Sequence, residues 1–327
     1  MKILILGSGS FAGQTLFSKL LLEEFDVFGI NRSLPLNSSM WEWRDRITKN
    51  LNWYQCNINE EPDKLISLVK LINPTHIVDF MGQGMVAPSW DDPRLWYKTN
   101  LAEKSYVLNS FLKLDSLQRY VRISTPEVFG SNTKFIKETS SFNPSTPYAI
   151  SHASIDYHLR CLGKQFNFPF VIGRFANFYG EGQQLYRVIP RLILSCLTGT
   201  EFVLDGGGES CRYFINSEDI VSSIKLLLFK ADIKTEYNFS GNEEIKILDL
   251  CKLVCELTDK KFESIVSFGP ERKGKDQYYR LDCKKAFEEL QWEPNISLKD
   301  GIIKTISWIE RNIDKLNQSS WNYEHKK

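Results

Sequence analysis

A glycine-rich turn follows the first apolar run of the chain. Lys2–Leu6 has the pattern of a buried strand, and Gly7-Ser8-Gly9-Ser10-Phe11-Ala12-Gly13 joins it to a helical periodicity over Phe11–Leu22. Small residues let a backbone approach a pyrophosphate, and the free N–H groups at a helix start attract the anion. Ser10 stands where a GxxGxxG turn has its middle glycine, and a serine still permits this approach. The turn therefore predicts a dinucleotide site formed by Gly7, Ser10, Phe11, Ala12 and Gly13.

Apolar strand-like runs alternate with helical periodicities through the first half of the chain, which is the pattern of a parallel sheet with crossover helices. The predicted fold is α/β, with a Rossmann-type doubly wound parallel sheet over residues 1–176. The expected strands are Lys2–Leu6, Val27–Ile30, Trp53–Cys56, His76–Phe80, Arg119–Ile123 and Phe168–Gly173. The expected helices are Phe11–Leu22, Pro62–Leu71, Arg94–Leu114 and Pro147–Gly163.

After about Asn177 the elements become shorter and the loops carry more glycine and arginine. A smaller, mixed α/β lobe is therefore expected mainly over residues 177–327, with a chain that can cross back between the lobes. Its expected helices are Leu185–Leu197, Ile247–Leu257 and Ser297–Asn312. The polar end, residues 312–327, is expected to be solvated and held down by Trp321 and Tyr323.

Composition excludes several classes of function. A net charge of +1 provides no field for capturing nucleic acid or an anionic membrane. No apolar run reaches the roughly 20 residues that span a bilayer, and the first residues have the pattern of a core strand rather than of a signal peptide. The 7 cysteines are scattered without a CxxC pair. We expect buried, reduced thiols in a cytoplasmic protein, and no metal site.

The end of the second strand bears on the choice of cofactor. Sites that prefer NAD usually place an acid there, whereas a basic residue accommodates the 2′-phosphate of NADP. Here the segment is Asn31-Arg32-Ser33. Asn31 has no charge to repel a phosphate, and the planar guanidinium of Arg32 can clamp one. The expected cofactor is therefore NADP or NAD, with NADP slightly favoured.

A hydroxyl, a carboxylate and a phenol are grouped between one strand end and the next helix. Ser124-Thr125-Pro126-Glu127-Val128-Phe129-Gly130 follows the fifth expected strand, and Tyr148-Ala149-Ile150-Ser151-His152 opens the next helix. This grouping suits a site that takes a proton from an alcohol while a nicotinamide takes the hydride. It predicts an oxidoreductive step at this edge of the sheet.

Taken in order along the chain, these segments resemble the extended short-chain dehydrogenase/reductase family, and within it the nucleotide-sugar epimerases and dehydratases. Nearly the whole chain takes part in the resemblance. Beyond the segments above, the matches are Cys56-Asn57-Ile58, Thr99-Asn100, Arg174–Gly180, Arg212-Tyr213-Phe214 with Asp219, Arg280-Leu281-Asp282 and Leu290–Pro294.

The resemblance implies roles for particular residues. Asn57, Ile58, Met81, Gly82 and Thr99 would join the glycine turn in holding the cofactor, together with Tyr148 and His152. Tyr148 would be the base that deprotonates the sugar C4 hydroxyl, and Thr125 would orient that hydroxyl. The nucleotide diphosphate of the substrate would be held by Asn177, Arg187, Arg212 and Arg280. A homodimer built on two long helices, Arg94–Leu114 and Pro147–Gly163, is also implied.

Two positions depart from the family pattern. In the 4,6-dehydratases a Thr-x-Glu at this strand end drives loss of water across C5 and C6. Its middle residue here is Pro126, which has no proton to give, while Glu127 is retained. His152 replaces the lysine of the family's Tyr-x-x-x-Lys, whose permanent cation lowers the pKa of the tyrosine. A mostly neutral histidine supplies less charge, so His152→Lys is expected to shift the pH–rate profile to lower pH.

The first choice of function is a nucleotide-sugar 4,6-dehydratase that retains its NAD(P). The alternatives are a decarboxylase, an epimerase or a C4 oxidase on the same scaffold, and a cofactor-binding sensor whose catalysis has decayed. Glu127 favours elimination or decarboxylation, because plain C4 epimerases usually lack it. Retention of Thr125, Glu127 and Tyr148 together argues against decay.

Overall fold

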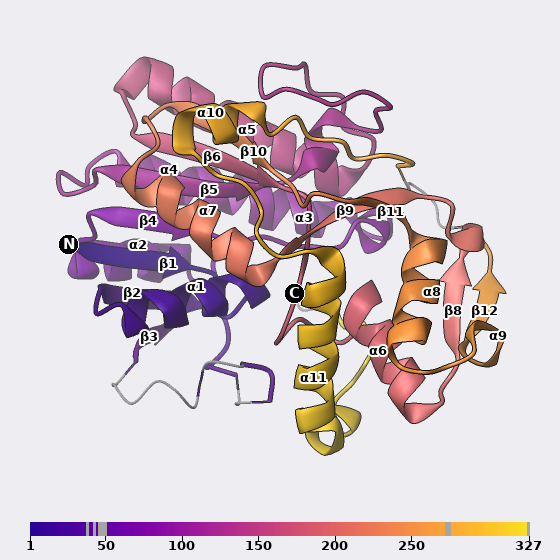
Figure 1. The fold of residues 1–327 in the computed structure, drawn as a ribbon. Helices are drawn as coiled ribbons and strands as arrows, with labels where there is room; N and C mark the ends of the chain where they lie inside the picture. The colour runs from indigo at the N-terminus through magenta and orange to yellow at the C-terminus, as the bar shows by residue number, and fades with distance from the viewer. Residues whose placement is uncertain (37–38, 42–43, 45–50, 272–275, 326–327) are drawn as a thin grey trace.

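A parallel sheet of seven strands forms the centre of the larger lobe (Figure 1). The computed structural model describes residues 1–36, 39–41, 44, 51–271 and 276–325. Every pairing in this sheet is parallel, and its strand order is β10-β6-β5-β4-β1-β2-β3. The doubly wound α/β fold predicted from the sequence is confirmed. The strands are β1 Lys2–Leu6, β2 Asp26–Asn31, β3 Asn52–Gln55, β4 His76–Asp79, β5 Arg119–Ser124, β6 Phe170–Phe175 and β10 Thr235–Phe239.

Helices cover both faces of this sheet. On one face α1 (Phe11–Leu22), α7 (Ser217–Phe229) and α10 (Lys284–Leu290) share an apolar core with the strands. On the other face lie α2 (Pro62–Ile72), α4 (Lys104–Phe111) and α5 (Pro147–Phe166). Strand β10 and helices α7 and α10 come from the second half of the chain, so the chain returns to the large sheet after residue 177.

The smaller lobe packs its helices against short sheets. One sheet has the order β11-β9-β7 and the other pairs β12 with β8. These short sheets share one apolar core with α6, α8 and α11. The elements are β7 Asn177–Tyr179, α6 Val188–Thr198, β8 Phe202–Asp205, β9 Cys211–Asn216, β11 Glu244–Lys246, α8 Ile247–Leu257, α9 Phe262–Ile265, β12 Val266–Gly269 and α11 Leu298–Asn317. Short 3-10 turns are η2 Ala87–Trp90, η4 Pro126–Phe129 and η5 Gly206–Gly208.

Several expected elements differ from the structure, and three of them are informative. The single helix expected over Arg94–Leu114 consists of α3 (Pro93–Tyr97), a π-helical segment η3 (Lys98–Glu103) and α4. Strand β6 begins at Phe170 rather than Phe168, because α5 ends in a left-handed cap at Asn167 and a proline follows at 169. Helix α11 continues past residue 312 because Leu316 is fully buried.

The last residues that the structure describes fold back on the protein. The indole of Trp321 donates to the carbonyl oxygen of Leu316, and the Arg191 guanidinium lies 5.0 Å from the Trp321 ring centroid. Tyr323 packs edge-on against Tyr186, with ring centroids 5.2 Å apart. Both aromatic residues expected to hold the tail therefore do so.

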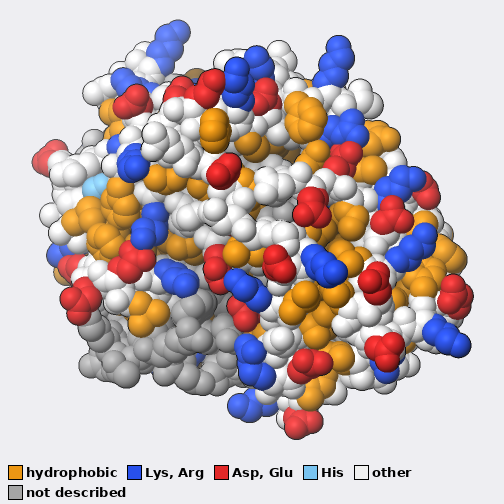
Figure 2. Space-filling model, viewed as in Figure 1, with side chains coloured by type: hydrophobic (Ala, Val, Ile, Leu, Met, Phe, Trp, Pro, Cys, Tyr) orange, Lys and Arg blue, Asp and Glu red, His pale blue; other side chains and the backbone are white. Residues whose placement is uncertain are grey.

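Charges of both signs are interspersed on the face seen in Figure 2, in keeping with the net charge of +1. Within the described part of the chain, no helix combines the length and apolarity needed to cross a bilayer. All seven cysteines are free thiols, and those on α8 lie in the core of the smaller lobe.

Candidate active site

Several of the predicted site residues lie at the carboxyl ends of the large sheet. Gly7 follows β1, Asn31 ends β2, Met81 follows β4 and Thr125 follows β5. Helix α5 begins beside them, and its first turn carries Tyr148. In doubly wound sheets this edge is where ligands bind, because the loops that leave adjacent strands diverge there.

The glycine turn is closely packed. Gly7 has φ +74°, and a Cβ at this position would lie 2.9 Å from the backbone nitrogen of Met81. A Cβ on Gly13 would lie 2.5 Å from the carbonyl oxygen of Gly7. Ser10 caps α1, and its hydroxyl oxygen accepts a hydrogen bond of 3.1 Å from the backbone N–H of Gly13. Ser10 thus adds a capping bond without blocking the turn.

The predicted adenosine end of the site forms a hollow of about 310 Å³. It contains three residues predicted to bind the cofactor, but also two glutamates. Burial lowers the pKa of Arg32, and its charge interacts with Tyr323 of the C-terminal tail and with Tyr186. Lys64 also lines this hollow and pairs with Glu61 at 2.7 Å, so its cations and carboxylates are equal in number. The lining residues are Arg32, Ser33, Gln55, Asn57, Glu60, Glu61 and Lys64.

The π-helical segment connects the loop after β4 to α5. Asn100 accepts a hydrogen bond of 2.7 Å from the backbone N–H of Gln83 and donates one of 2.9 Å to the hydroxyl of Ser151. Its neighbour Thr99 accepts from the side chain of Asn59 at 2.9 Å. A Cβ on Gly82 would lie 3.0 Å from Asn100 Oδ1. Single π turns recur at functional sites, and this one fixes the wall of the cofactor cleft.

Thr125, Glu127 and Tyr148 lie close together. Burial raises the pKa of Tyr148 most, the charge of Glu127 raises it further, and a hydrogen bond from Thr125 lowers it. Burial raises the pKa of Glu127 to about 7, against the opposing effects of its backbone hydrogen bond, Arg212 and Arg187. A carboxyl group with this pKa can take and return a proton near neutrality.

His152 lies one helical turn from Tyr148, and the two ring centroids are 4.4 Å apart. Its Nδ1 atom is 2.8 Å from Nη2 of Arg122 on β5. Its Nε2 atom is buried and has no hydrogen-bond partner among the described residues. A buried polar atom left without a partner is costly, so this one indicates a ligand. With the glycine cradle, it shows that these residues fit a nicotinamide dinucleotide.

Sequence reasoning missed a set of buried charges beneath α5. Lys104 Nζ is 2.6 Å from Asp79 Oδ2, and the hydroxyl of Tyr120 donates to the same carboxylate. On the other side of His152, Asp156 accepts from Arg174 at 2.9 Å. The signal was present in the sequence, because a central parallel strand is buried on both faces and a charge within it requires a partner.

The four residues predicted to hold the nucleotide diphosphate have different surroundings. Asn177 begins β7, and Arg187 lies beside the loop after β4, with Nη2 3.5 Å from the position of a Cβ on Gly84. Arg212 is held by the backbone carbonyl oxygens of Cys211, Asp276 and Gln277.

Arg280 is paired with a carboxylate of the protein itself. Its guanidinium forms two hydrogen bonds of 2.6 Å with the carboxylate of Glu244, and it also donates to Thr133 O. A ligand would have to displace Glu244 to reach Arg280. Arg187 and Arg212, by contrast, lie close enough to Glu127 for their charges to lower its pKa.

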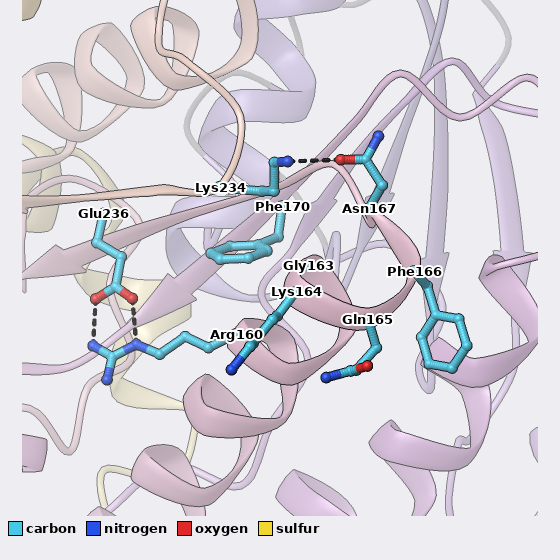
Figure 3. Close-up of a pocket in the computed structure, with 9 residues that line it drawn as sticks. All are labelled: Arg160, Gly163, Lys164, Gln165, Phe166, Asn167, Phe170, Lys234 and Glu236. Atoms are coloured by element: carbon cyan, nitrogen blue, oxygen red, sulfur yellow. Dashed lines mark hydrogen bonds and ion pairs between the residues drawn. The ribbon is translucent and has the colours of Figure 1, made fainter.

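A second hollow, of about 720 Å³, lies at the other end of α5 (Figure 3). Four of its polar side chains pair with one another: Arg160 with Glu236, and Lys234 with Asn167 at 2.6 Å. None of the predicted site residues lines it. Within the described ranges, no three His, Cys, Asp or Glu side chains are grouped to hold a metal ion.

The fold and the site together define an NAD(P)-type member of the extended short-chain dehydrogenase/reductases, of the nucleotide-sugar epimerase and dehydratase kind. The comparison with known families agrees. Residues 4–305 match the family described as GDP-mannose 4,6 dehydratase, and the chain belongs to that family.

Curated relatives cover the chain to different extents. It is 24% identical to the dTDP-glucose 4,6-dehydratase of Salmonella typhimurium over 359 aligned positions, which include 99% of each chain. It is 27% identical over 240 residues to a trifunctional UDP-glucose 4,6-dehydratase of Arabidopsis thaliana. That alignment includes 72% of this chain but only 36% of the plant enzyme.

Two solved structures share the fold. The dTDP-glucose 4,6-dehydratase DesIV of Streptomyces venezuelae, which contains NAD, superposes with a TM-score of 0.88 at 25% identity over 96% of this chain and 98% of its own. A UDP-glucose 4-epimerase of Thermotoga maritima gives a TM-score of 0.87 at 25% identity, over 96% of this chain and 100% of its own. Overall similarity therefore does not choose between dehydration and epimerisation.

Proposed function

We propose that the protein is a nucleotide-sugar 4,6-dehydratase. The observation that carries this proposal is the position of Glu127 beside Tyr148 and Thr125, with a pKa of about 7. Epimerisation at C4 needs one acid–base group, whereas loss of water across C5 and C6 needs a second. Glu127 is that second group. The dehydratases among the relatives support the same reaction.

Each proton transfer of the proposed reaction is assigned to one residue. Tyr148 takes the proton of the C4 hydroxyl, which Thr125 orients. The nicotinamide, when bound, supplies hydride transfer from C4 and back to C6. Glu127 takes the C5 proton, now acidified by the C4 ketone, and gives it to the C6 hydroxyl, which leaves as water. The proton that Tyr148 received balances the one added at C5, so the net change is the loss of one water.

NAD is the proposed cofactor, although the sequence slightly favoured NADP. The similar S. venezuelae enzyme contains NAD, and no comparison supports a preference for NADP. Denaturing the purified protein and separating the released nucleotides tests this directly. Release of NADP alone would contradict it.

The activity test is incubation with UDP-, GDP-, dTDP- and CDP-sugars, read by mass spectrometry. The expected product has lost one water, carries a 4-keto group and leaves added cofactor unreduced. A product of unchanged mass would identify an epimerase. An oxidised product that accumulates with reduced cofactor would identify a C4 oxidase.

Pro126 favours one second candidate, a decarboxylase. The middle residue of Thr125-Pro126-Glu127 has no proton to donate to a leaving hydroxyl, and the loss of carbon dioxide from a 6-carboxylated sugar requires none. The charges of Arg187 and Arg212 both act on Glu127, and Arg187 could bind such a carboxylate. Release of carbon dioxide from a nucleotide-linked uronic acid would distinguish the two reactions.

A homodimer in the cytoplasm is proposed as the working form. Leu108, Phe111, Ile155, Leu159 and Leu162 are buried in the core, so they are not an interface. Exposed apolar side chains remain on α4 and α5, however: Tyr106 at 50%, Ile150 at 40% and Tyr157 at 48% exposure. Light scattering of the purified protein tests the dimer. The free thiols support a reducing compartment.

A further inference from the structure

We propose that Arg122 and His152 together replace the family's lysine, with Arg122 supplying the permanent charge and His152 a fixed hydrogen-bond donor toward the cofactor ribose. The catalytic meaning of this pair rests on the proposed function. Its geometry does not, and it can be tested without turnover.

The position of Arg122 follows from the alternation of side chains along β5. Tyr120 packs in the core beneath α4 and α5, whereas Val121 and Ile123 pack on the opposite face of the sheet. Arg122 therefore points toward α5, where its side chain is 1% exposed. On α5 it contacts His152 through a hydrogen bond, and Asp156 lies 3.8 Å from its Nε atom.

The hydrogen bond between the two residues fixes the proton on His152. An arginine has only donors and does not lose its charge in proteins, so His152 Nδ1 at 2.8 Å must be the acceptor. The imidazole is then neutral, with its proton on Nε2. A second proton, on Nδ1, would place an N–H donor of His152 directly against the N–H donor of Arg122. Burial, then Arg122 and Lys104, accordingly hold the pKa of His152 well below its usual value.

The Nε2–H group is aimed where a ligand is expected. His152 is 7% exposed, and Nε2 has no partner among the described residues. The ring lies beside the Tyr148 ring on the cleft side of α5. A neutral Nε2–H can donate to a ribose hydroxyl, as the lysine ammonium would.

The charge balance around Arg122 leaves one positive charge. Lys104 and Asp79 neutralise each other at 2.6 Å. The remaining connected network has three guanidiniums and two carboxylates: Arg122, Arg160, Arg174, Asp156 and Glu236.

The excess charge lies at the His152 end of that network. Arg160 and Arg174 contact their carboxylates at 2.6 to 2.9 Å, whereas Arg122 Nε is 3.8 Å from Asp156 Oδ1, too far for a hydrogen bond. Arg187 and then Arg122 lower the pKa of Tyr148, against burial and Glu127. Of these two cations, Arg122 is the one that contacts His152, so it supplies the charge at the position of the family's lysine, while His152 has the positional role.

This arrangement changes the expected effect of His152→Lys. With Arg122 in place, a lysine at 152 adds a second buried cation beside the first and beside Lys104. The single variant is therefore expected to lose activity rather than gain it at lower pH. Arg122→Met with His152→Lys returns the family's single cation, and this double variant should exceed His152→Lys in turnover by about tenfold, one pKa unit of the phenol.

Nitrogen-15 NMR of the histidine rings tests the pair without substrate. His152, assigned by loss of its signals in His152→Gln, should show the Nε2–H tautomer and no titration between about pH 5 and pH 8. Titration near the ordinary value, or an Nδ1–H tautomer, overturns the proposal. In Arg122→Met, both the tautomer preference and the amount of NAD retained on purification should fall. An unchanged spectrum would also overturn it.

The pH profile separates the charge of Arg122 from a purely structural role. Arg122→Met should move the acid limb of kcat/KM to higher pH by about one unit and lower turnover about tenfold below it, because the phenol loses a nearby cation. Arg122→Lys should restore the limb. If Arg122→Met folds and the acid limb of its kcat/KM profile stays at the wild-type pH, the proposal is contradicted. Absence of any dehydration contradicts the proposed function instead, and the NMR result still decides the pair.

Discussion

The carboxylate of Glu127 opposes ionisation of the Tyr148 phenol. Burial raises the pKa of Tyr148 most, and the negative charge of Glu127 raises it further. The phenol is therefore easiest to ionise while Glu127 is protonated, yet proton removal at C5 needs the Glu127 carboxylate. A pKa of about 7 lets Glu127 exist in both forms near neutrality, as two successive proton transfers require.

Glu127→Gln should separate these steps. Oxidation at C4 should persist, since Gln removes the opposing charge, while formation of the 4-keto-6-deoxy product falls by about 10²–10⁴-fold. A single-turnover measurement would show a burst of reduced nicotinamide absorbance that does not decay. Glu209→Gln, at an exposed ion pair with Lys246, is the matched control. Dehydration by Glu127→Gln at the wild-type rate would show that Glu127 is not the base.

The same group predicts a dependence of stability on pH. Burial raises the pKa of Glu127 from 4.5 to about 7, so the folded state binds more protons than the unfolded state between these values. Its contribution to stability is present below the lower value and is lost as the pH rises through the upper one. Relative to Glu127→Gln, the wild-type free energy of unfolding should fall by about 1–2 kcal/mol over that interval, given partial solvent contact. Urea denaturation at several pH values measures it, and parallel curves would contradict the prediction.

Tyr148→Phe removes the proposed base for the C4 hydroxyl. Turnover should fall by about 10²–10⁴-fold while the bound NAD content stays close to wild type, because His152 and the glycine turn are unchanged. Tyr157→Phe, an exposed tyrosine on the same helix, is the control and should keep its activity. Turnover that survives Tyr148→Phe would exclude this tyrosine from the chemistry.

Much of the large sheet could be predicted from the sequence because its signals are local. The limits of α1 and α8 agree with the expected ranges to the residue, since an apolar periodicity and a clear boundary coincide at each end. The π-helical turn at Lys98–Glu103 could not be predicted, because its apolar periodicity is that of an ordinary helix. Its consequence, Asn100 joined to both Gln83 and Ser151, depends on contacts distant in sequence.

In the site too, residues with a local sequence signal could be predicted, whereas contacts between distant residues could not. Thr125, Glu127 and Tyr148 were identifiable because each lies at a predicted strand or helix end. Arg122 was not, although it interrupts the apolar pattern of β5, since nothing in the sequence indicates that His152 is its partner. The commitment of Arg280 to Glu244 was equally hidden, because the two residues are 36 positions apart.

Arg187 and Arg280 should differ in their effects on substrate binding. Arg187→Ala should raise KM for the nucleotide sugar by about 10–100-fold, the equivalent of one charge-assisted hydrogen bond to phosphate, with a smaller change in kcat. Arg280→Ala should change KM by less than about threefold, because Glu244 already occupies its guanidinium. Arg94→Ala, at an exposed ion pair with Asp92, is the control. A larger effect at Arg280 than at Arg187 would mean that substrate opens the Arg280–Glu244 pair.

The buried pair of Lys104 and Asp79 predicts a difference between single and double variants. Both side chains are almost fully buried and lie 2.6 Å apart, and Asp79 also accepts from Tyr120 and from the backbone N–H of Met81. Lys104→Met leaves a buried carboxylate without its cation, so the free energy of unfolding should fall by about 3–5 kcal/mol. Asp79→Asn with Lys104→Met removes both charges and should recover a large part of that loss. Denaturant unfolding measures both; a double variant no more stable than Lys104→Met would show that packing of the lysine stem, rather than the unpaired charge, accounts for the loss.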